Sequence, residues 1–221
     1  VVGVGVSFGG PVDATRGVVL RSHHVPGWEG LPLAIGLSQR LGAPTVVEND
    51  ANAQALGEWR YGAGRGTTSL LCLNIGTGIG GGVVLDGRIY RGAHGLAGEI
   101  GHTIVWPGGP LCTCGKHGCL EAVAAGPGIA RRATAALAVA PERATLLIRR
   151  AGADGTVPSA GVVFEAAAHG DPVAAEVIAE TISYLAIGLA NAINVLDPEV
   201  VVLGGGVTRA GEQLFGPLRE A

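Results

Sequence analysis

The stretch TVVENDANAQALGEW, residues 45–59, contains the change from strand to helix on which the fold assignment rests. Thr45–Val47 is a short run of β-branched residues, and Ala51–Trp59 is rich in alanine and other helix formers. A strand that continues through a polar junction into a helix is the repeating unit of α/β proteins. Asn49 and Asp50 occupy that junction, at the carboxyl end of the predicted strand, where α/β proteins place their ligands.

The same order of elements recurs at both ends of the chain. Val1–Phe8 is predicted to be a buried strand that ends in the turn Gly9-Gly10-Pro11. Val200–Leu203 is predicted to be another buried strand, which the turn Gly204-Gly205-Gly206 connects to a last helix. The recurrence of strand, glycine-rich turn and helix indicates an α/β protein.

Two further features define the predicted organisation. Pro172–Leu196 is long and almost entirely apolar, which predicts a buried helix. Gly62–Gly66 is predicted to be a loop and a domain boundary. We therefore expect a small N-terminal α/β domain over residues 1–66 and a larger α/β domain over residues 67–221.

Composition and charge exclude several classes of protein. The 221 residues carry a net charge of −3 and a single lysine, so they offer no basic surface for nucleic acid. We find no apolar run with the roughly 20 uncharged residues of a transmembrane helix, and the start lacks the basic region of a signal peptide. We expect a cytoplasmic protein without nucleic-acid or membrane contacts.

Three closely spaced cysteines and a histidine suggest a metal site. His102, Cys112, Cys114 and Cys119 form the pattern H-x9-C-x-C-x4-C, which supplies three thiolates and one imidazole. Four such ligands are typical of a structural zinc site. The alternative is a loop that contains reduced cysteines. Cys72 lies in a predicted strand and is expected to be an ordinary core residue.

A glycine-rich turn, GTGIGGG over Gly76–Gly82, lies between two predicted strands. Backbone N–H groups in such a turn can bind a phosphate, and Thr77 adds a hydroxyl. The turn is not a Walker A loop, because it lacks Gly-Lys-Ser/Thr and no helix follows it. From the residues alone, a tight hairpin without a ligand is equally well supported.

Asn49 and Asp50 also have two interpretations. Asp50 could act as the general base toward a hydroxyl that attacks a phosphate. Alternatively, Asn and Asp are residues that commonly cap the start of a helix. Glu99 and Glu121 flank the cysteine segment, and their apolar neighbours favour partial burial over full exposure. A zinc loop that holds both carboxylates would present two acceptors to sugar hydroxyls.

These pieces, in this order, resemble the ROK family of bacterial sugar kinases and related repressors. The resemblance covers nearly all of the chain, and AGEIGH (Ala97–His102) and CTCGKHGCLE (Cys112–Glu121) carry the family signature. It implies the two-domain actin/hexokinase-like fold, also called ribonuclease H-like, with ATP and sugar between the domains. It also implies a structural Zn²⁺ and a Mg²⁺ that accompanies ATP.

The resemblance further implies roles for individual residues. Asp50 resembles the catalytic base. The implied sugar-binding residues are Gly10, Pro11, Asn49, Glu99, His102 and Glu121, and His102 also binds zinc. The implied nucleotide-binding residues are Gly76, Thr77 and Gly78 for the phosphates, with Gly204 and Gly205 near the adenosine.

The sequence departs from the family pattern in two respects. The opening strand with an Asp-x-Gly-Gly-Thr turn is absent, and so is the final stretch that follows the last helix. We therefore expect a chain that is truncated at both ends and a poor catalyst as it stands. His24 lies where many family glucokinases have asparagine, and a sugar contact or a surface histidine are equally supported there.

The predicted function is an ATP-dependent sugar kinase, glucokinase-like, which transfers the γ-phosphate to a hexose hydroxyl, expected to be O6. The substrate would be a hexose or an N-acetylhexosamine, and we expect a homo-oligomer, most simply a dimer. The alternative is the sugar-sensing domain of a ROK repressor that lacks its helix-turn-helix. Retention of both Asp50 and the phosphate turn favours the kinase.

Overall fold

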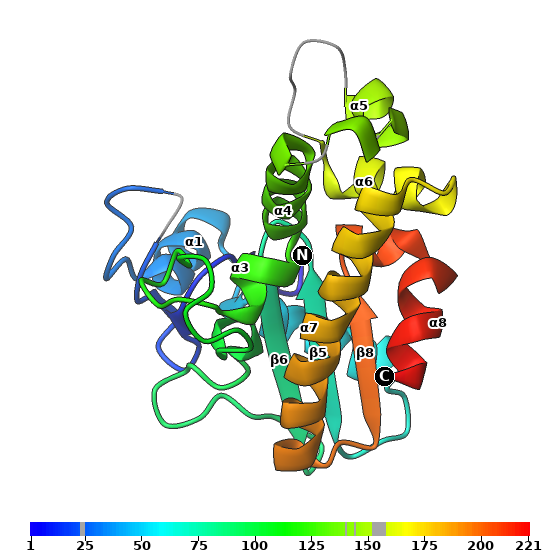
Figure 1. The fold of residues 1–221 in the computed structure, drawn as a ribbon. Helices are drawn as coiled ribbons and strands as arrows, with labels where there is room; N and C mark the ends of the chain where they lie inside the picture. The colour runs from blue at the N-terminus through cyan, green and yellow to red at the C-terminus, as the bar shows by residue number, and fades with distance from the viewer. Residues whose placement is uncertain (23–24, 140, 144, 152–157) are drawn as a thin grey trace. The chain divides into compact units, whose positions relative to one another are not determined.

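A computed structural model describes residues 1–22, 25–139, 141–143, 145–151 and 158–221 (Figure 1). His24 therefore lies outside the described residues. The strands are β1 (Val4–Phe8), β2 (Val12–Asp13), β3 (Val18–Val19), β4 (Thr45–Asn49), β5 (Leu70–Ile75), β6 (Ile79–Leu85), β7 (Arg88–Ile89) and β8 (Val200–Gly204). The α-helices are α1 (Leu33–Leu41), α2 (Asp50–Tyr61), α3 (Leu120–Ala124), α4 (Gly126–Val139), α5 (Thr145–Ala151), α6 (Ala160–Ala168), α7 (Pro172–Leu196) and α8 (Glu212–Glu220). Short 3₁₀ helices are η1 (Ile100–His102), η2 (Pro141–Arg143) and η3 (Gly206–Ala210).

The strands form three sheets among the described residues. β1 pairs with β4 in parallel, β2 pairs with β3 antiparallel, and the third sheet has the order β7-β6-β5-β8. Asp86 and Gly87, both with positive φ, make the hairpin between β6 and β7, as the sequence predicts. One expectation was wrong in detail. Gly205 and Gly206 lead first into η3, and α8 begins only at Glu212.

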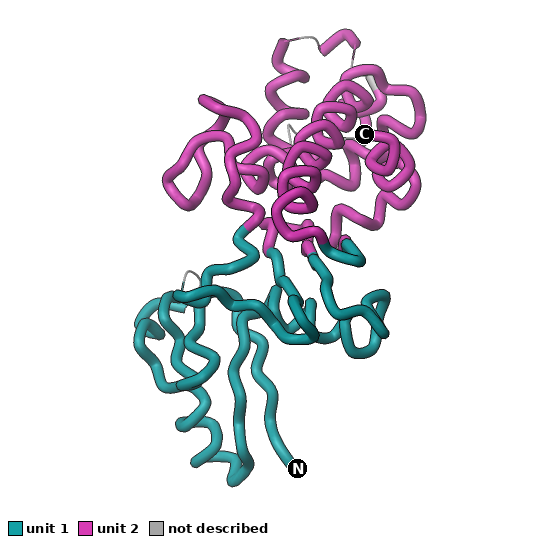
Figure 2. The backbone as a smooth tube through the Cα atoms, turned by 90° about the horizontal axis from the view of Figure 1, so that it is seen from below, with its two compact units in different colours: residues 1–72, 81–99, 198–202 teal, residues 73–80, 100–197, 203–221 magenta. Residues whose placement is uncertain are grey.

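The chain divides into two compact units, which Figure 2 distinguishes by colour. Unit 1 comprises residues 1–72, 81–99 and 198–202, and unit 2 comprises residues 73–80, 100–197 and 203–221. Each unit is assembled from three separate segments of the chain. The division of the chain into domains at residue 66 stays a prediction.

Two small hydrophobic clusters lie among the described residues of unit 1. One lies between β1, β4 and α1 and includes the buried side chains of Val47 and Ala34. The other includes Ala55 of α2 together with Leu70 and Cys72 of β5. Burial raises the pKa of the Cys72 thiol to about 12, so this cysteine is a neutral core residue, as predicted.

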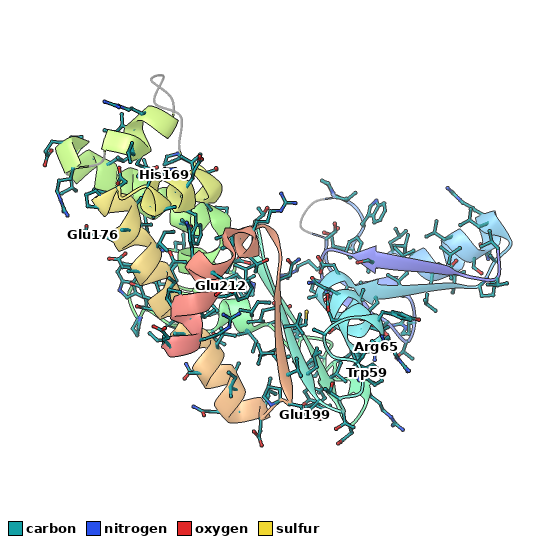
Figure 3. All side chains as sticks on the ribbon, turned by 90° about the vertical axis from the view of Figure 1, so that its right-hand side faces the viewer. Trp59, Arg65, His169, Glu176, Glu199 and Glu212 are labelled. Carbon is teal, nitrogen blue, oxygen red and sulfur yellow. The ribbon has the colours of Figure 1, made fainter. Side chains whose placement is uncertain are left out.

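Glu199 anchors the beginning of β8 to the beginning of β5 within unit 1. Figure 3 labels this side chain beside the first residues of β8. Its Oε1 accepts hydrogen bonds from the backbone N–H and hydroxyl groups of Thr68 and Ser69, at 2.8–3.3 Å. The hydroxyl and backbone donors of Thr68, followed by those of Ser69, lower the pKa of the Glu199 carboxyl. The carboxylate is thereby kept ionised and holds two strand ends together.

α7 is the central helix of unit 2, where it packs against α3, α4, α6 and α8 (Figure 1). Its buried side, which includes Val177, Ile178 and Leu185, belongs to the largest hydrophobic cluster of the unit. α7 is long and apolar enough to cross a membrane by length and composition, with a mean hydropathy of 1.6 over 18 residues. Half of this 18-residue stretch is buried inside the protein, as expected of a core helix.

Replacing Asp171 by alanine should destabilise unit 2 by about 3 kcal/mol. Asp171 is 2% exposed and caps two helices at once. Its Oδ1 accepts from the backbone N–H of Ala174 in α7, and its Oδ2 accepts from those of Leu146 and Leu147 in α5. Urea unfolding measures the loss. Ser159→Ala, which removes the exposed cap of α6, is the control and should cost about 1 kcal/mol or less. Equal losses of unfolding free energy in the two variants would contradict the conclusion that Asp171 caps two helices.

Candidate active site and metal centre

The carboxyl ends of β1 and β4 meet in unit 1, because the two strands are parallel. Their register pairs Phe8 with Asn49, which brings the turn after β1 beside the start of α2. Asn49 Nδ2 donates a hydrogen bond of 3.2 Å to the carbonyl oxygen of Gly10. A Cβ at Gly10, where φ is +152°, would lie 2.9 Å from the Arg21 carbonyl oxygen. This tight turn therefore requires glycine, and Gly10 and Pro11 lie next to Asn49 as the predicted sugar loop would need.

One of the two roles considered for the Asn49-Asp50 junction, the helix cap, belongs to Asn49. Asn49 is the cap of α2, because its Oδ1 accepts the backbone N–H of Asn52 at 3.1 Å. Asp50 is exposed in the first turn, where its Oδ1 accepts from the backbone N–H of Ala51 and from Asn49 Nδ2. Its Oδ2 has no hydrogen-bond partner among the described residues and faces Gly9, which has no side chain to cover it. That oxygen can accept a proton from a substrate hydroxyl.

Glu99 lies at the end of a loop that is tightly held within unit 1. The preceding residue, Gly98, has φ of +87°, and a Cβ there would lie 2.5 Å from the carbonyl oxygen of Gly81 in β6. β6 in turn approaches α2, because a Cβ at Gly82 would lie 2.5 Å from a backbone oxygen of that helix. Close backbone contacts therefore join the loop that carries Glu99 to the helix that carries Asp50. The Glu99 side chain is exposed.

In unit 2, the predicted metal ligands converge. The ligand atoms of His102, Cys112, Cys114 and Cys119 all lie within 4.8 Å of one another. The Cys114 and Cys119 sulfurs are 3.6 Å apart, as are the Cys112 sulfur and His102 Nδ1. A tetrahedral zinc ion with bonds of about 2.3 Å needs ligand separations of about 3.8 Å. The four donors therefore fit a zinc ion.

The chemistry of the donors also fits a cation. Burial, followed by the hydrogen bonds and charges of the neighbouring Cys114 and Cys112, raises the pKa of the Cys119 thiol to about 12. Three sulfurs this close cannot all be ionised unless a positive ion lies between them. The His102 ring presents Nδ1 to the cluster, so Nε2 lies on the opposite side of the ring.

Glu121 connects the cysteine loop to the glycine-rich turn at Gly76–Gly82. Its Oε2 accepts the backbone N–H of Ile79 at 3.0 Å, and its Oε1 accepts the Thr113 hydroxyl at 3.2 Å. The Cys112 sulfur lies 3.8 Å from the same Oε1. A Cβ at Gly78 would lie 2.6 Å from Oε2, so the carboxylate occupies the space that any other residue would fill. The metal loop and the turn therefore depend on one half-buried carboxylate.

The two glycine turns lie at the same end of β5. Gly76 and Gly78 close the first turn through an N–H···O bond of 2.9 Å, and Thr77 is exposed at its tip. The Gly76 carbonyl oxygen accepts the backbone N–H of Gly126, where α4 begins. Gly205 has φ of +97°, and a Cβ there would lie 2.4 Å from the last carbonyl oxygen of β5. This contact requires glycine and holds the second turn against the strand.

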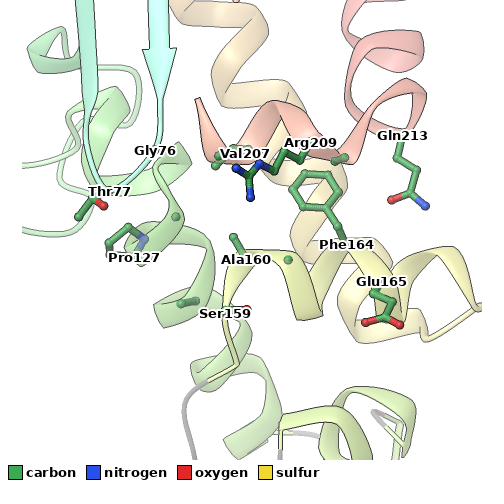
Figure 4. A pocket seen from close by; sticks show the side chains of 15 residues that line it. Gly76, Thr77, Pro127, Ser159, Ala160, Phe164, Glu165, Val207, Arg209 and Gln213 are labelled. Carbon is green, nitrogen blue, oxygen red and sulfur yellow. The ribbon is translucent and has the colours of Figure 1, made fainter. Parts of the chain in front are cut away.

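A cavity of about 840 Å³ in unit 2 opens on both turns (Figure 4). It is lined by Gly76, Thr77, Gly126, Pro127, Ala130, Ser159, Ala160, Gly161, Phe164, Glu165, Gly206, Val207, Arg209, Ala210 and Gln213. The first turns of α4 and α6 face it, and a helix start attracts anions. Phe164 and Arg209 project into the same space (Figure 4). This volume and lining suit a ligand of nucleotide size.

The cavity lining overlaps in part with the predicted nucleotide-binding residues. Gly76 and Thr77 line the cavity, whereas Gly78, Gly204 and Gly205 are not among the lining residues. Pro127, Ala160, Phe164 and Arg209 line it but were missed from sequence. Only Pro127 had a signal, because Gly-Pro-Gly at the start of a helical run marks a helix beginning. The other three come from segments whose pattern gives no indication of a ligand.

The predicted sugar ligands divide between the two units. Gly10, Pro11, Asn49 and Glu99 belong to unit 1 with Asp50, and His102 and Glu121 belong to unit 2. In unit 1, Asn49 ends β4 and Gly10 and Pro11 follow β1, whereas in unit 2 Glu121 contacts Ile79 at the start of β6.

Comparison with known proteins decides the family. The sequence profile of the ROK family matches residues 1–221. The chain belongs to the ROK family. A glucokinase of Thermotoga maritima is 42% identical to this ROK chain over 217 residues, which are 98% of the chain and 68% of the relative. A xylose repressor of Caldicellulosiruptor bescii is 32% identical over 232 residues. The match covers 100% of this chain and 54% of the repressor.

A solved structure supports the fold assignment. A ROK family glucokinase from Streptomyces griseus, in complex with glucose and AMPPNP, superposes with a TM-score of 0.86 and 40% identity, covering 100% of this chain and 70% of that one. The chain therefore has the α/β fold of the actin/hexokinase type, as predicted. It spans about two-thirds of the length of the glucokinases it matches.

Proposed function

We propose that this ROK chain carries the active site of an ATP-dependent sugar kinase, with Asp50 as the general base. The observation that carries the proposal is the placement of Asp50 at the joint carboxyl end of β1 and β4, with one carboxylate oxygen uncommitted among the described residues. The similarity to glucokinases adds support. The proposed substrate is a hexose, and phosphorylation at O6 rests on the likeness to glucokinases alone.

In the proposed reaction, Asp50 Oδ2 accepts the proton of a sugar hydroxyl while the oxygen of that hydroxyl attacks the γ-phosphorus of ATP. The bond between the γ-phosphorus and the bridging oxygen breaks, and ADP leaves. Asn49 and Glu99 of unit 1 are proposed to bind sugar hydroxyls, and His102 and Glu121 stay predicted sugar ligands. Mg²⁺, which enters with ATP, supplies charge neutralisation on the phosphates.

The unit 2 cavity is the proposed ATP site. The turn Gly76-Thr77 and the start of α4 offer N–H groups to phosphates, and Phe164 offers an apolar surface to a base. His102 and the three cysteines would hold a zinc ion, which would take no part in the transfer. The ion would fix the loop that positions His102 and Glu121. The cytoplasmic location and the homodimer stay predictions.

A second candidate function is the sugar-sensing domain of a ROK repressor. The specific observation that favours it is the xylose repressor, which matches the whole of this chain. Such a domain needs sugar affinity but no proton acceptor. The exposed Asp50 and the unit 2 cavity have no role in it, so we favour the kinase.

A panel of hexoses and N-acetylhexosamines, incubated with ATP and the complete protein, tests the proposal through ADP release. We expect glucose or a close relative of it to be phosphorylated. Ala160→Trp, which fills the cavity, should raise the KM for ATP by at least roughly tenfold and leave that for sugar unchanged. The exposed Ala135 of α4 does not line the cavity, and Ala135→Trp is the matched control.

Each outcome of this panel has a distinct meaning. Sugar binding by calorimetry without any turnover would favour the repressor domain over the kinase. Failure to bind or phosphorylate any sugar would contradict both functions. An unchanged KM for ATP in Ala160→Trp would remove the cavity as the nucleotide site.

A further inference from the structure

Glu48, one residue before Asn49, has a carboxylate whose two oxygens are both committed. Oε1 accepts from the backbone N–H of Asn49 at 3.0 Å and from Nδ2 of Asn52 at 3.2 Å. Oε2 accepts from Nε and Nη2 of Arg91, at 3.0 and 2.5 Å. The Glu48 side chain is only 17% exposed. A charge-assisted pair through two guanidinium nitrogens fixes direction as well as distance.

Arg91 is the first residue of the loop that leads to Glu99. Its carbonyl oxygen accepts the backbone N–H of Ala97 at 3.1 Å, which closes residues 91–97 into a compact turn. A Cβ at Gly92 would lie 3.2 Å from the Ala97 side chain, so the turn is closely packed. At its far end, Gly98 rests against β6. The turn is therefore held at the Glu48 carboxylate and at the β6 backbone, and Gly95 lies close to the Val12 carbonyl oxygen.

Glu48 and Asp50 lie at the same strand end. The ion pair between Glu48 and Arg91 therefore links two parts of the proposed site. On one side lie Asn49 and Asp50, and on the other lies the loop that carries Glu99. All of these residues belong to unit 1. The other contacts of the loop, of Gly95 with the Val12 carbonyl oxygen and of Gly98 with β6, are approaches of its backbone. The Glu48–Arg91 pair adds a charged side-chain anchor at the start of the loop.

We infer that the Glu48–Arg91 ion pair is a positioning device that sets sugar affinity by holding the loop of Glu99 against the strand end of Asp50. The inference rests on the proposed function for its kinetic consequence. The restraint that this ion pair places on the loop, which we call the clamp, does not depend on turnover. Neither residue is among the proposed sugar-binding or catalytic groups, so both are assigned as positioning residues.

Kinetics of the complete protein test the consequence. Arg91→Ala should raise the KM for sugar by roughly tenfold, change kcat by less than about threefold and leave the KM for ATP unaltered. Arg91→Lys keeps the charge but not the two-nitrogen geometry, and should restore part of the affinity. Arg88→Ala is the matched control, because Arg88 is exposed on β7 and has no side-chain partner in the described part of the chain. It should behave as the wild type.

A double-mutant cycle tests whether the two residues act as one unit. Glu48→Gln alone should raise the sugar KM about as much as Arg91→Ala, and the double variant should do no worse than either single variant. Additive effects would overturn the inference. So would a sugar KM that Arg91→Ala leaves unchanged, or equal losses toward sugar and ATP.

Hydrogen exchange separates failure of the clamp from failure of the proposed function. In Arg91→Ala without ligands, amides of residues 92–98 should exchange faster, while those of β5 keep their protection. If the wild type phosphorylates no sugar, the proposed function fails, and faster exchange confined to 92–98 still supports the clamp. Unchanged exchange in that segment overturns the clamp, whatever the activity.

Discussion

Asp50→Asn should lower kcat for sugar phosphorylation by roughly 10²–10⁴-fold and change the KM for sugar by less than about threefold. Asparagine has the same shape and can keep the hydrogen bond from the Ala51 N–H through its carbonyl oxygen. It cannot take a proton from an attacking hydroxyl. Steady-state kinetics with ATP and the preferred sugar measure both constants.

Asp86→Asn provides the matched control for this experiment. Asp86 lies in the β6–β7 hairpin with φ of +50°, a conformation that asparagine tolerates well. The same chemical change at that position should leave kcat unaltered. A kcat within about fivefold of the wild type in Asp50→Asn would remove Asp50 as the base. A large rise in sugar KM alone would reassign it to sugar binding.

Cys112→Ser combined with Cys114→Ser should reduce the zinc content from about one ion per chain to nearly none. Structural zinc sites contribute folding free energy directly. A loss on the order of 3 kcal/mol would lower the Tm of a domain of this size by roughly 6–12 °C. Elemental analysis and thermal unfolding measure the two effects, and incubation with a chelator should reproduce them.

The same variant should weaken sugar binding. Glu121 and His102 are held in place by the cysteine loop, through the Thr113 hydroxyl and the cluster itself. Cys72→Ala, a change at a buried cysteine outside the cluster, is the control and should retain the zinc. If the double variant keeps its fold and its sugar affinity, the structural role of zinc is wrong.

The local pattern of residue types was sufficient to predict most of the helices and strands. The strand at residues 45–47 and the helix after it were predicted because β-branched residues and alanines have opposite preferences. The hairpin at Asp86-Gly87 follows from turn chemistry. The start of α2 was predicted one residue late, because the sequence does not distinguish which of two adjacent polar residues is the cap.

The cavity lining could not be predicted in the same way. Phe164 lies in a stretch with weak periodicity, and Arg209 follows a glycine turn that was expected to lead directly into a helix. Both reach the cavity because α6 and η3 come together in the fold. Contacts of this kind depend on packing between distant segments, and the residue types alone do not predict them.

The sequence by itself determined the family, the α/β class, the cluster of candidate metal ligands and the position of Asp50, because each depends on residue types at short, specific spacings. Only the tertiary structure decided that Asn49 is the cap, which leaves Asp50 Oδ2 uncommitted among the described residues. It also revealed that Glu121 joins the zinc loop to the phosphate turn, and that Glu48 holds Arg91. The bonds from Ile79 to Glu121 and from Arg91 to Glu48 join residues 42 and 43 positions apart, and only the folded backbone brings such residues within hydrogen-bonding distance.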